Sequence, residues 1–200
     1  MADWDENSPI LQKNLSSVLQ HIEDDSHKRI MPTVEHARKW QIEIMKGLDV
    51  PNPDYIGKFR GEKGLENIGV MIGSHRGTAS YDVTGELAKF EATLQTIIKA
   101  LDEQIKPGDP CGPQDLQATI DLCAWVHSEW VRIHPFANGN GRTARIWVNA
   151  IAMRYGLPPF LKLRPRPGDG YEAAAEQAMQ NNWKASVNLF RKMLDEALDA

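Results

Sequence analysis

Apolar residues recur at helical spacing in several stretches of the chain, and segments rich in proline and glycine separate these stretches. In residues 9–23 the apolar positions are Ile10, Leu11, Leu15, Val18, Leu19 and Ile22. This spacing predicts an amphipathic helix. The same pattern returns over residues 33–48, where Pro51 follows, and over residues 84–105. The first half of the chain therefore predicts three helices.

The second half repeats the helical pattern around one short interruption. A helix is predicted from Pro113 to His134, where Pro135 disfavours helical backbone in the residue before it. One face of that helix carries Leu116, Ile120, Cys123, His127 and Trp130. A further helix is expected after Gly141 and up to Gly156, and one or two closing helices from Tyr171 to the end. We interpret His127 as a core histidine, and the tryptophans as filling for the core or an interface.

Residues 55–83 break the helical pattern. Glycine recurs through this segment, and residues 68–72 form a short run that favours a β-strand. A small hairpin or an extended loop is predicted here, and no second domain is required because a helix follows at once. The expected fold class is mainly α, a single helical bundle with a small β-hairpin. Residues 1–31 are expected to form an N-terminal tail with one amphipathic helix, and residues 32–200 the domain itself.

Composition narrows the function classes. The chain has 200 residues, of which 42% are hydrophobic and 25% charged, and its net charge of −4 argues against broad binding to nucleic acid. Cys111 and Cys123 are too few for a disulfide framework or a four-cysteine zinc site. No apolar run reaches the roughly 18 residues of a membrane span, and the start does not resemble a signal peptide. We expect a cytoplasmic protein without membrane contact, although delivery into another cell would leave no trace in this sequence.

The chemistry concentrates in residues 134–145, His-Pro-Phe-Ala-Asn-Gly-Asn-Gly-Arg-Thr-Ala-Arg. Gly139 and Gly141 permit unusual backbone conformations and close approach of a ligand. Successive N–H groups before a helix form an anion site, and Arg142 and Arg145 lie one turn apart on that helix. His134 is placed to act as a general base near neutral pH. The segment therefore predicts a polyphosphate site beside a base.

This segment resembles the signature of the Fic family, His-x-Phe-x-(Asp/Glu)-Gly-Asn-Gly-Arg-x-x-Arg. Seven of its eight named residues are present, and Asn138 stands at the acidic position. The order of the predicted helices, with a hairpin near residues 57–73, is also similar to that of a Fic domain. The resemblance implies a protein adenylyltransferase that transfers AMP from ATP, with Mg²⁺, to a Ser, Thr or Tyr hydroxyl of a target protein.

The resemblance also implies roles for individual residues. His134 would take the proton of the attacking hydroxyl. Gly139, Asn140 and Gly141 would cradle the α- and β-phosphates, the Asn140 amide donating to them, while Arg142 and Arg145 would hold the β- and γ-phosphates. Phe136 would face the core, and Tyr171 would contact the base of the nucleotide. Residues 55–83 would form the flap, which receives an extended segment of the target protein at its edge.

Asn138 replaces the carboxylate that usually binds Mg²⁺ in this family. An amide oxygen can coordinate the ion but brings no negative charge. Three outcomes are open: weaker AMP transfer with Mg²⁺, a changed nucleotide or transferred group, or a protein that binds nucleotide without efficient transfer. The main alternative to an enzyme is therefore a nucleotide-binding regulatory or interaction module, and a phosphotransferase is a third reading.

An inhibitory helix with the pattern (Ser/Thr)-x-x-x-Glu-(Gly/Asn) is common in the family. No segment of this sequence matches it. Two explanations stay open: a separate antitoxin-like protein inhibits the enzyme, or the chain is not controlled in this way.

Overall fold

The computed structural model describes residues 8–108, 111–168 and 170–199. The predicted N-terminal tail that precedes the first helix lies almost wholly outside these ranges. The helices of this part of the chain are α1 (Pro9–His27), α2 (Val34–Met45), α3 (Val83–Gln104), α4 (Pro113–Ile133), α5 (Asn140–Arg154), α6 (Tyr171–Ala178) and α7 (Val187–Leu198). One hairpin, β1 (Met71–Ile72) and β2 (His75–Arg76), completes the set together with short 3-10 turns. The predicted mainly helical fold with a small hairpin is confirmed.

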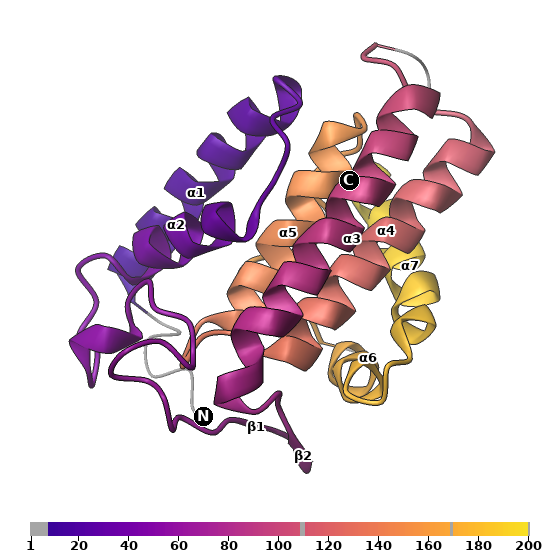
Figure 1. Ribbon diagram of the computed structural model, residues 1–200. Helices are drawn as coiled ribbons and strands as arrows, with labels where there is room; N and C mark the ends of the chain where they lie inside the picture. The colour runs from indigo at the N-terminus through magenta and orange to yellow at the C-terminus, as the bar shows by residue number, and fades with distance from the viewer. Residues whose placement is uncertain (1–7, 109–110, 169, 200) are drawn as a thin grey trace.

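Helices α4 and α5 form the centre of the bundle. Helix α4 contacts α3, α5, α6 and α7, while α1 and α2 pack on the other side of α5 (Figure 1). Burial on α4 is therefore wider than one stripe: Leu122, Val126 and Val131 are buried in addition to Ile120, Cys123, His127 and Trp130 of the predicted face. A helix with neighbours on several sides buries more than one face, and the line through Asp121, Trp125 and Glu129 stays partly exposed.

An aromatic cluster fills the space between α2, α3, α4 and α5. Trp147 lies with its ring centroid 4.8 Å from Trp40, 5.6 Å from Phe90 and 5.6 Å from Trp130. The indole N–H of Trp130 donates to the Thr143 hydroxyl over 2.8 Å, which satisfies its polar group inside the core. The interpretation of these tryptophans as core filling is confirmed, whereas Trp4 lies outside the described residues.

Two boundaries differ from the sequence prediction. Helix α1 continues to His27, and Ile10, predicted in its buried stripe, is 48% exposed. Leu11, the next residue, is 1% exposed, so Ile10 lies on a face of the helix turned away from the buried stripe of Leu11, Leu15 and Val18. The predicted hairpin near residues 57–73 is shifted: its strands pair Met71 with Arg76 and Ile72 with His75. Residues 57–70 turn instead, because Gly57, Gly61 and Gly64 have positive φ angles.

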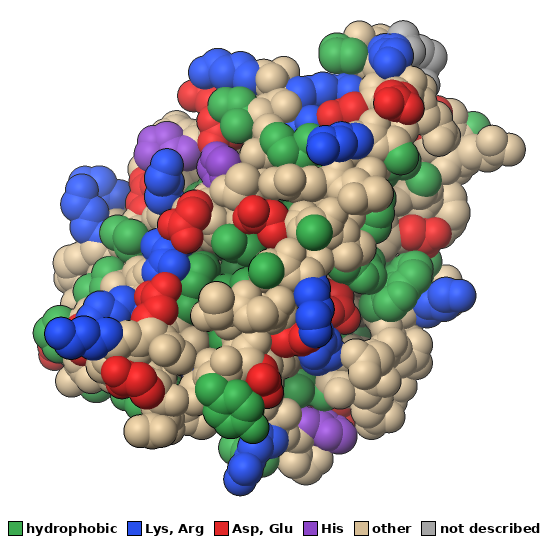
Figure 2. Space-filling model, viewed as in Figure 1, with side chains coloured by type: hydrophobic (Ala, Val, Ile, Leu, Met, Phe, Trp, Pro, Cys, Tyr) green, Lys and Arg blue, Asp and Glu red, His purple; other side chains and the backbone are tan. Residues whose placement is uncertain are grey.

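The surface carries both signs of charge. On the face shown in Figure 2, basic and acidic side chains are interspersed rather than gathered into a single field. No helix in the described ranges is both long and apolar enough to span a membrane.

Candidate functional site

His134 lies where α4 ends. Its backbone is in the left-handed region, with φ 52° and ψ 57°, and its N–H still donates to the Trp130 carbonyl over 2.9 Å. This conformation turns the chain sharply out of the helix, in keeping with the proline that follows. Gly77, just after the hairpin, packs closely here: a Cβ added to it would lie 3.3 Å from the Cβ of His134. The residue that follows the hairpin and the end of α4 therefore meet at this histidine.

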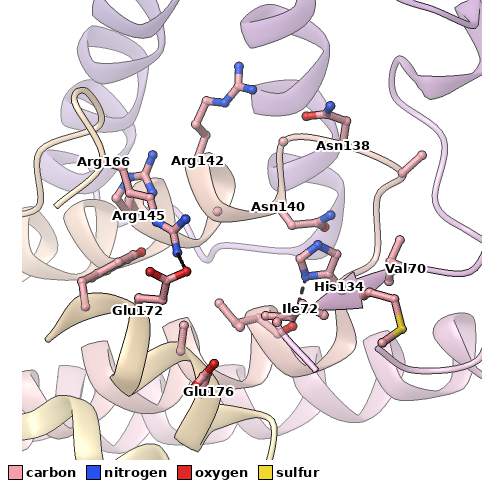
Figure 3. A pocket seen from close by; sticks show the side chains of 18 of the residues that line it. Val70, Ile72, His134, Asn138, Asn140, Arg142, Arg145, Arg166, Glu172 and Glu176 are labelled. Carbon is pink, nitrogen blue, oxygen red and sulfur yellow. Dashed lines mark hydrogen bonds and ion pairs between the residues drawn. The ribbon is translucent and has the colours of Figure 1, made fainter. Parts of the chain in front are cut away.

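One ring nitrogen of His134 is held by the backbone. Nδ1 lies 3.2 Å from the carbonyl oxygen of Val131 (Figure 3). A carbonyl can only accept, so Nδ1 carries the proton and Nε2 of the neutral ring has a lone pair. Burial, together with the positive charge of Arg60, lowers the pKa of His134 to about 4, although the bond to Val131 opposes this shift. His134 is thus neutral, and able to accept a proton, at neutral pH.

The loop between α4 and α5 is fixed by the side chain of Asn140. Its Oδ1 accepts from the Phe136 N–H over 2.8 Å, and its Nδ2 donates to the Phe136 carbonyl over 2.8 Å. Phe136 itself is fully buried, as predicted, and forms an antiparallel bridge with Phe59. Asn140 therefore shapes the loop through two buried bonds. The amide donation to phosphate that the resemblance implies stays a prediction.

The two glycines of the loop differ. Gly139 has φ 88°, a backbone conformation that favours glycine, and an added Cβ would also lie 2.9 Å from Cε of Met45. Gly141 belongs to the first turn of α5, and an added Cβ would meet Arg145 Nη1 at an ordinary 3.6 Å. The expectation of an unusual backbone is confirmed at Gly139 and wrong at Gly141. The absence of a side chain at Gly141 instead leaves the N-terminal end of α5 open to a ligand.

Arg142 and Arg145 both border the same cavity, and each is 4% exposed. In Figure 3 Arg142 projects to the same side of the loop as Asn138, whereas Arg145 is directed toward Arg166 and Glu172. Arg145 donates through Nη2 to the Leu163 carbonyl over 3.0 Å, and its guanidinium lies 5.9 Å from the ring centroid of Tyr171 at the start of α6. Two positive charges therefore stand near the positive end of the α5 dipole.

The cavity has a volume of about 500 Å³ and brings together all the site residues predicted from the sequence. It is bordered by His134, by the loop from Ala137 to Arg142, by Arg145, by residues 69–73 of the flap, and by α6. Asn138, 7% exposed, belongs to this wall, and the Gln41 amide donates to its carbonyl over 3.3 Å. The described residues contain no group of three His, Cys, Asp or Glu side chains that could hold a metal ion.

Three charged residues of the cavity wall are not among the site residues predicted from the sequence. Glu172 and Glu176 lie on α6, and Arg166 precedes that helix, with its Nη2 3.7 Å from Oε1 of Glu172. An added Cβ at Gly73 would lie 2.9 Å from Oε1 of Glu176, so the hairpin tip closes against α6. The sequence gives little indication of their place in the wall, because charged residues on a short helix are typical of a solvated surface.

Tyr171 and His127 form a buried pair behind this wall. The Tyr171 hydroxyl lies 2.6 Å from Nε2 of His127, and the two residues are 3% and 0% exposed. Burial is the main cause that lowers the pKa of His127 to about 3, and the positive charge of Arg145 contributes. His127 is a core histidine, as predicted. The expected contact of Tyr171 with a nucleotide base is limited to its ring, because its hydroxyl is directed to His127.

The chain is similar in sequence to known proteins. A family model described as Fic/DOC family matches residues 32–152. The chain is 29% identical over 128 residues to a Protein adenylyltransferase Fic of Nematostella vectensis, a match that covers 64% of this chain and 29% of that protein. A protein of the same name from Culex quinquefasciatus is 44% identical over 92 residues, 46% of this chain and 15% of its own.

The fold also matches a solved structure. A Fic domain containing signaling protein from Bacteroides thetaiotaomicron superimposes with a TM-score of 0.66 at 17% identity, over 95% of this chain and 69% of that one. At this identity the match concerns the fold alone. The matched segments span less than a third of the length of the two adenylyltransferases named above.

Proposed function

The chain belongs to the Fic/DOC family, and from this premise we propose that it is a protein adenylyltransferase, which transfers AMP from ATP to a hydroxyl group of another protein. One observation carries the proposal: a neutral histidine with an available Nε2 borders the same cavity as a helix N-terminus and two arginines. A base beside a polyphosphate site is what transfer of a nucleotide to a hydroxyl needs. The names of the similar animal proteins support the same activity.

The steps follow from the positions of the residues. Nε2 of His134 accepts the proton of the target hydroxyl, and the hydroxyl oxygen attacks the α-phosphorus of ATP. A new O–P bond forms, the bond between the α-phosphorus and the bridging oxygen breaks, and pyrophosphate leaves with its charge. The N–H groups at residues 139–141 would bind the α- and β-phosphates. Arg142 and Arg145 would bind the β- and γ-phosphates and stabilise the leaving group.

Asn138 is the residue of this site that could bind Mg²⁺. Asn138 can offer a neutral amide oxygen at the cavity wall, so the remaining ligands would come from phosphate oxygens and water. The ion would neutralise charge on the phosphates. We propose weak Mg²⁺ binding that depends on bound nucleotide. Asn138→Asp adds one negative charge and should lower the Mg²⁺ concentration needed for half-maximal transfer.

The target protein would dock along the flap. Strands β1 and β2 form a two-stranded sheet, so their outer edges can accept a further strand. Met71 of β1 is 56% exposed, which leaves an apolar side chain for the target beside the cavity. A separate antitoxin-like inhibitor stays part of the proposal, beside the reading that this chain is not controlled in this way.

Labelled ATP tests the proposal. The protein is incubated with α-labelled ATP and a protein lysate, and modified proteins are separated and weighed by mass spectrometry. An added mass of AMP that disappears in His134→Ala supports the proposal. Labelling that persists in His134→Ala would refute His134 as the base, and an added phosphate alone would favour a phosphotransferase.

A second candidate rests on Asn138. If its missing charge abolishes turnover, the protein binds nucleotide without transferring it and acts as a regulatory module. Calorimetry would then show ATP binding to the wild-type protein, with no labelled product. Transfer that appears in Asn138→Asp would identify the amide as the cause.

A further inference from the structure

Arg60 is a fully buried arginine that takes no part in the steps proposed above. Its exposed fraction is 0%, although arginine is among the residues least often buried without a charged partner. In the described part of the chain its guanidinium donates to three backbone carbonyls and to no carboxylate. Burial lowers the pKa of Arg60 to about 10, which still leaves the side chain charged at neutral pH. A buried charge of this kind is costly, so its contacts call for an explanation.

The three carbonyls lie around the predicted base. Nε donates to the carbonyl of His134 over 2.7 Å, and Nη2 to that of Ile133 over 2.9 Å. These are the last residue of α4 and its left-handed cap, where helix carbonyls have no partner within the helix and the dipole is negative. Nη1 donates to the carbonyl of Ile68, just before the flap hairpin, over 3.1 Å. One rigid fork therefore joins the end of α4 to the residues just before the hairpin of the flap.

Neighbouring contacts hold Arg60 in register with the active-site loop. Its N–H donates to the Pro135 carbonyl over 2.7 Å, and Phe59 forms a bridge with Phe136. The rings of Phe59 and Phe136 lie 4.8 Å apart. Residues 59 and 60 thus follow residues 133–136 as a short partner strand. This arrangement fixes four consecutive residues around His134.

We propose that Arg60 is the positioning residue of this site, which holds His134 in its left-handed backbone conformation so that Nδ1 faces the Val131 carbonyl and Nε2 faces the cavity. A left-handed backbone is unfavourable for histidine and persists where surrounding contacts impose it. The hydrogen bonds from Arg60 to the carbonyls on both sides of the His134 Cα supply that constraint. Because the same fork reaches Ile68, it also fixes the base relative to the flap on which a target would dock. The catalytic consequence rests on the proposed transfer reaction, whereas the ring orientation does not.

The test compares Arg60→Lys with Arg154→Lys. Lysine keeps the charge but cannot reach three carbonyls with one planar fork. Arg154 is a control for the loss of a buried guanidinium away from the site: it is 6% exposed, donates to the Ile30 carbonyl over 2.9 Å, pairs with Asp102 and does not border the cavity. Nitrogen-15 NMR of labelled histidine reports which ring nitrogen of His134 carries the proton, and His134→Gln assigns the signal. Transfer kinetics and ATP affinity are measured in parallel.

We expect the wild-type protein and Arg154→Lys to show the Nδ1–H form of His134, and Arg60→Lys to show a mixture of both forms. Transfer by Arg60→Lys should fall roughly 10- to 100-fold in kcat, as small displacements of a catalytic group do. Its affinity for ATP should change by less than about threefold, since the phosphate-binding residues lie on α5.

An unchanged ring form and unchanged kcat in a folded Arg60→Lys would overturn the inference. If that variant does not fold, the wild-type protein gives the test. Slow solvent exchange of the Arg60 side-chain N–H groups and a single Nδ1–H form of His134 support the positioning role of Arg60, and fast exchange or a mixed ring form refutes it. If the wild-type protein transfers nothing, the proposed function fails, but the NMR result still judges the role of Arg60.

Discussion

Asn140 lies in the segment that resembles a phosphate-binding signature, yet the structure gives its side chain a second task. Both polar atoms of the amide bond to the backbone of Phe136, at 2.8 Å each, and the residue is 2% exposed. Asn140→Ala would leave a buried N–H and a buried carbonyl without these partners. We therefore predict that this substitution destabilises the whole domain, in addition to weakening nucleotide binding.

The magnitude follows from the two lost bonds. A buried polar group left without its partner costs about 1–3 kcal/mol, and water from the adjacent cavity would recover part of this. The free energy of unfolding should therefore fall by about 2–4 kcal/mol. For a protein of this size, about 2–4 °C of melting temperature corresponds to 1 kcal/mol, so the melting temperature should fall by about 4–16 °C.

The chain offers a matched control at Asn149. Its side chain bonds to the backbone of Leu161 in the same two-way manner, at 2.8 Å and 3.0 Å, and it is 1% exposed. Asn149→Ala should lose a similar stability, within about 1 kcal/mol, because the lost bonds are of the same kind. Its ATP affinity should stay close to that of the wild-type protein, since Asn149 does not border the cavity.

Urea unfolding followed by tryptophan fluorescence measures the stability, and titration calorimetry measures ATP affinity. The aromatic cluster around Trp147 gives the unfolding signal. If Asn140→Ala unfolds at the wild-type urea concentration while its ATP affinity falls, the reasoning is wrong. The amide would then act on the nucleotide alone and would not hold the loop.

Three further predictions concern the loop, the base and the core. Gly139→Ala should lower the free energy of unfolding by about 1–3 kcal/mol and weaken ATP binding, because Gly139 has a φ of 88°. Gly141→Ala should keep the wild-type melting temperature, and equal melting temperatures for the two variants would contradict the prediction. The pKa of His134 is lowered to about 4, so kcat/KM should be level from pH 7 down to about 5 and fall near pH 4, and a fall centred near pH 6.5 would refute the shift. His134 should also make the free energy of unfolding decline as the pH drops from about 6.5 to 4, because the unfolded chain binds more protons in this range. Asp102→Ala should lower the free energy of unfolding in urea by about 3 kcal/mol, because it removes the carboxylate whose Oδ2 lies 2.5 Å from Nη2 of the buried Arg154. A loss below about 1 kcal/mol would show that this ion pair contributes little to stability.

The sequence alone was sufficient to predict the helices and to group the residues of the candidate site. The helical period of residues such as Leu87, Phe90 and Leu94 is a local property, and each of these three is buried as the period requires. The spacing from His134 to Arg145 is also local, because a helix end, a short loop and one helical turn bring these residues to a common cavity. Adjacent residues in sequence could therefore be read as a site.

Only the tertiary structure determined which residues surround the segment from His134 to Arg145. Arg60 stands in a glycine-rich stretch with no periodic pattern, and a lone arginine there is ordinarily exposed. Its burial depends on carbonyls more than 70 positions away in α4. Glu172 and Glu176 likewise border the cavity because α6 packs against α4, a contact that no local spacing encodes. Local periods fix which residues share a helix face, whereas contacts between distant segments depend on the packing of the whole chain.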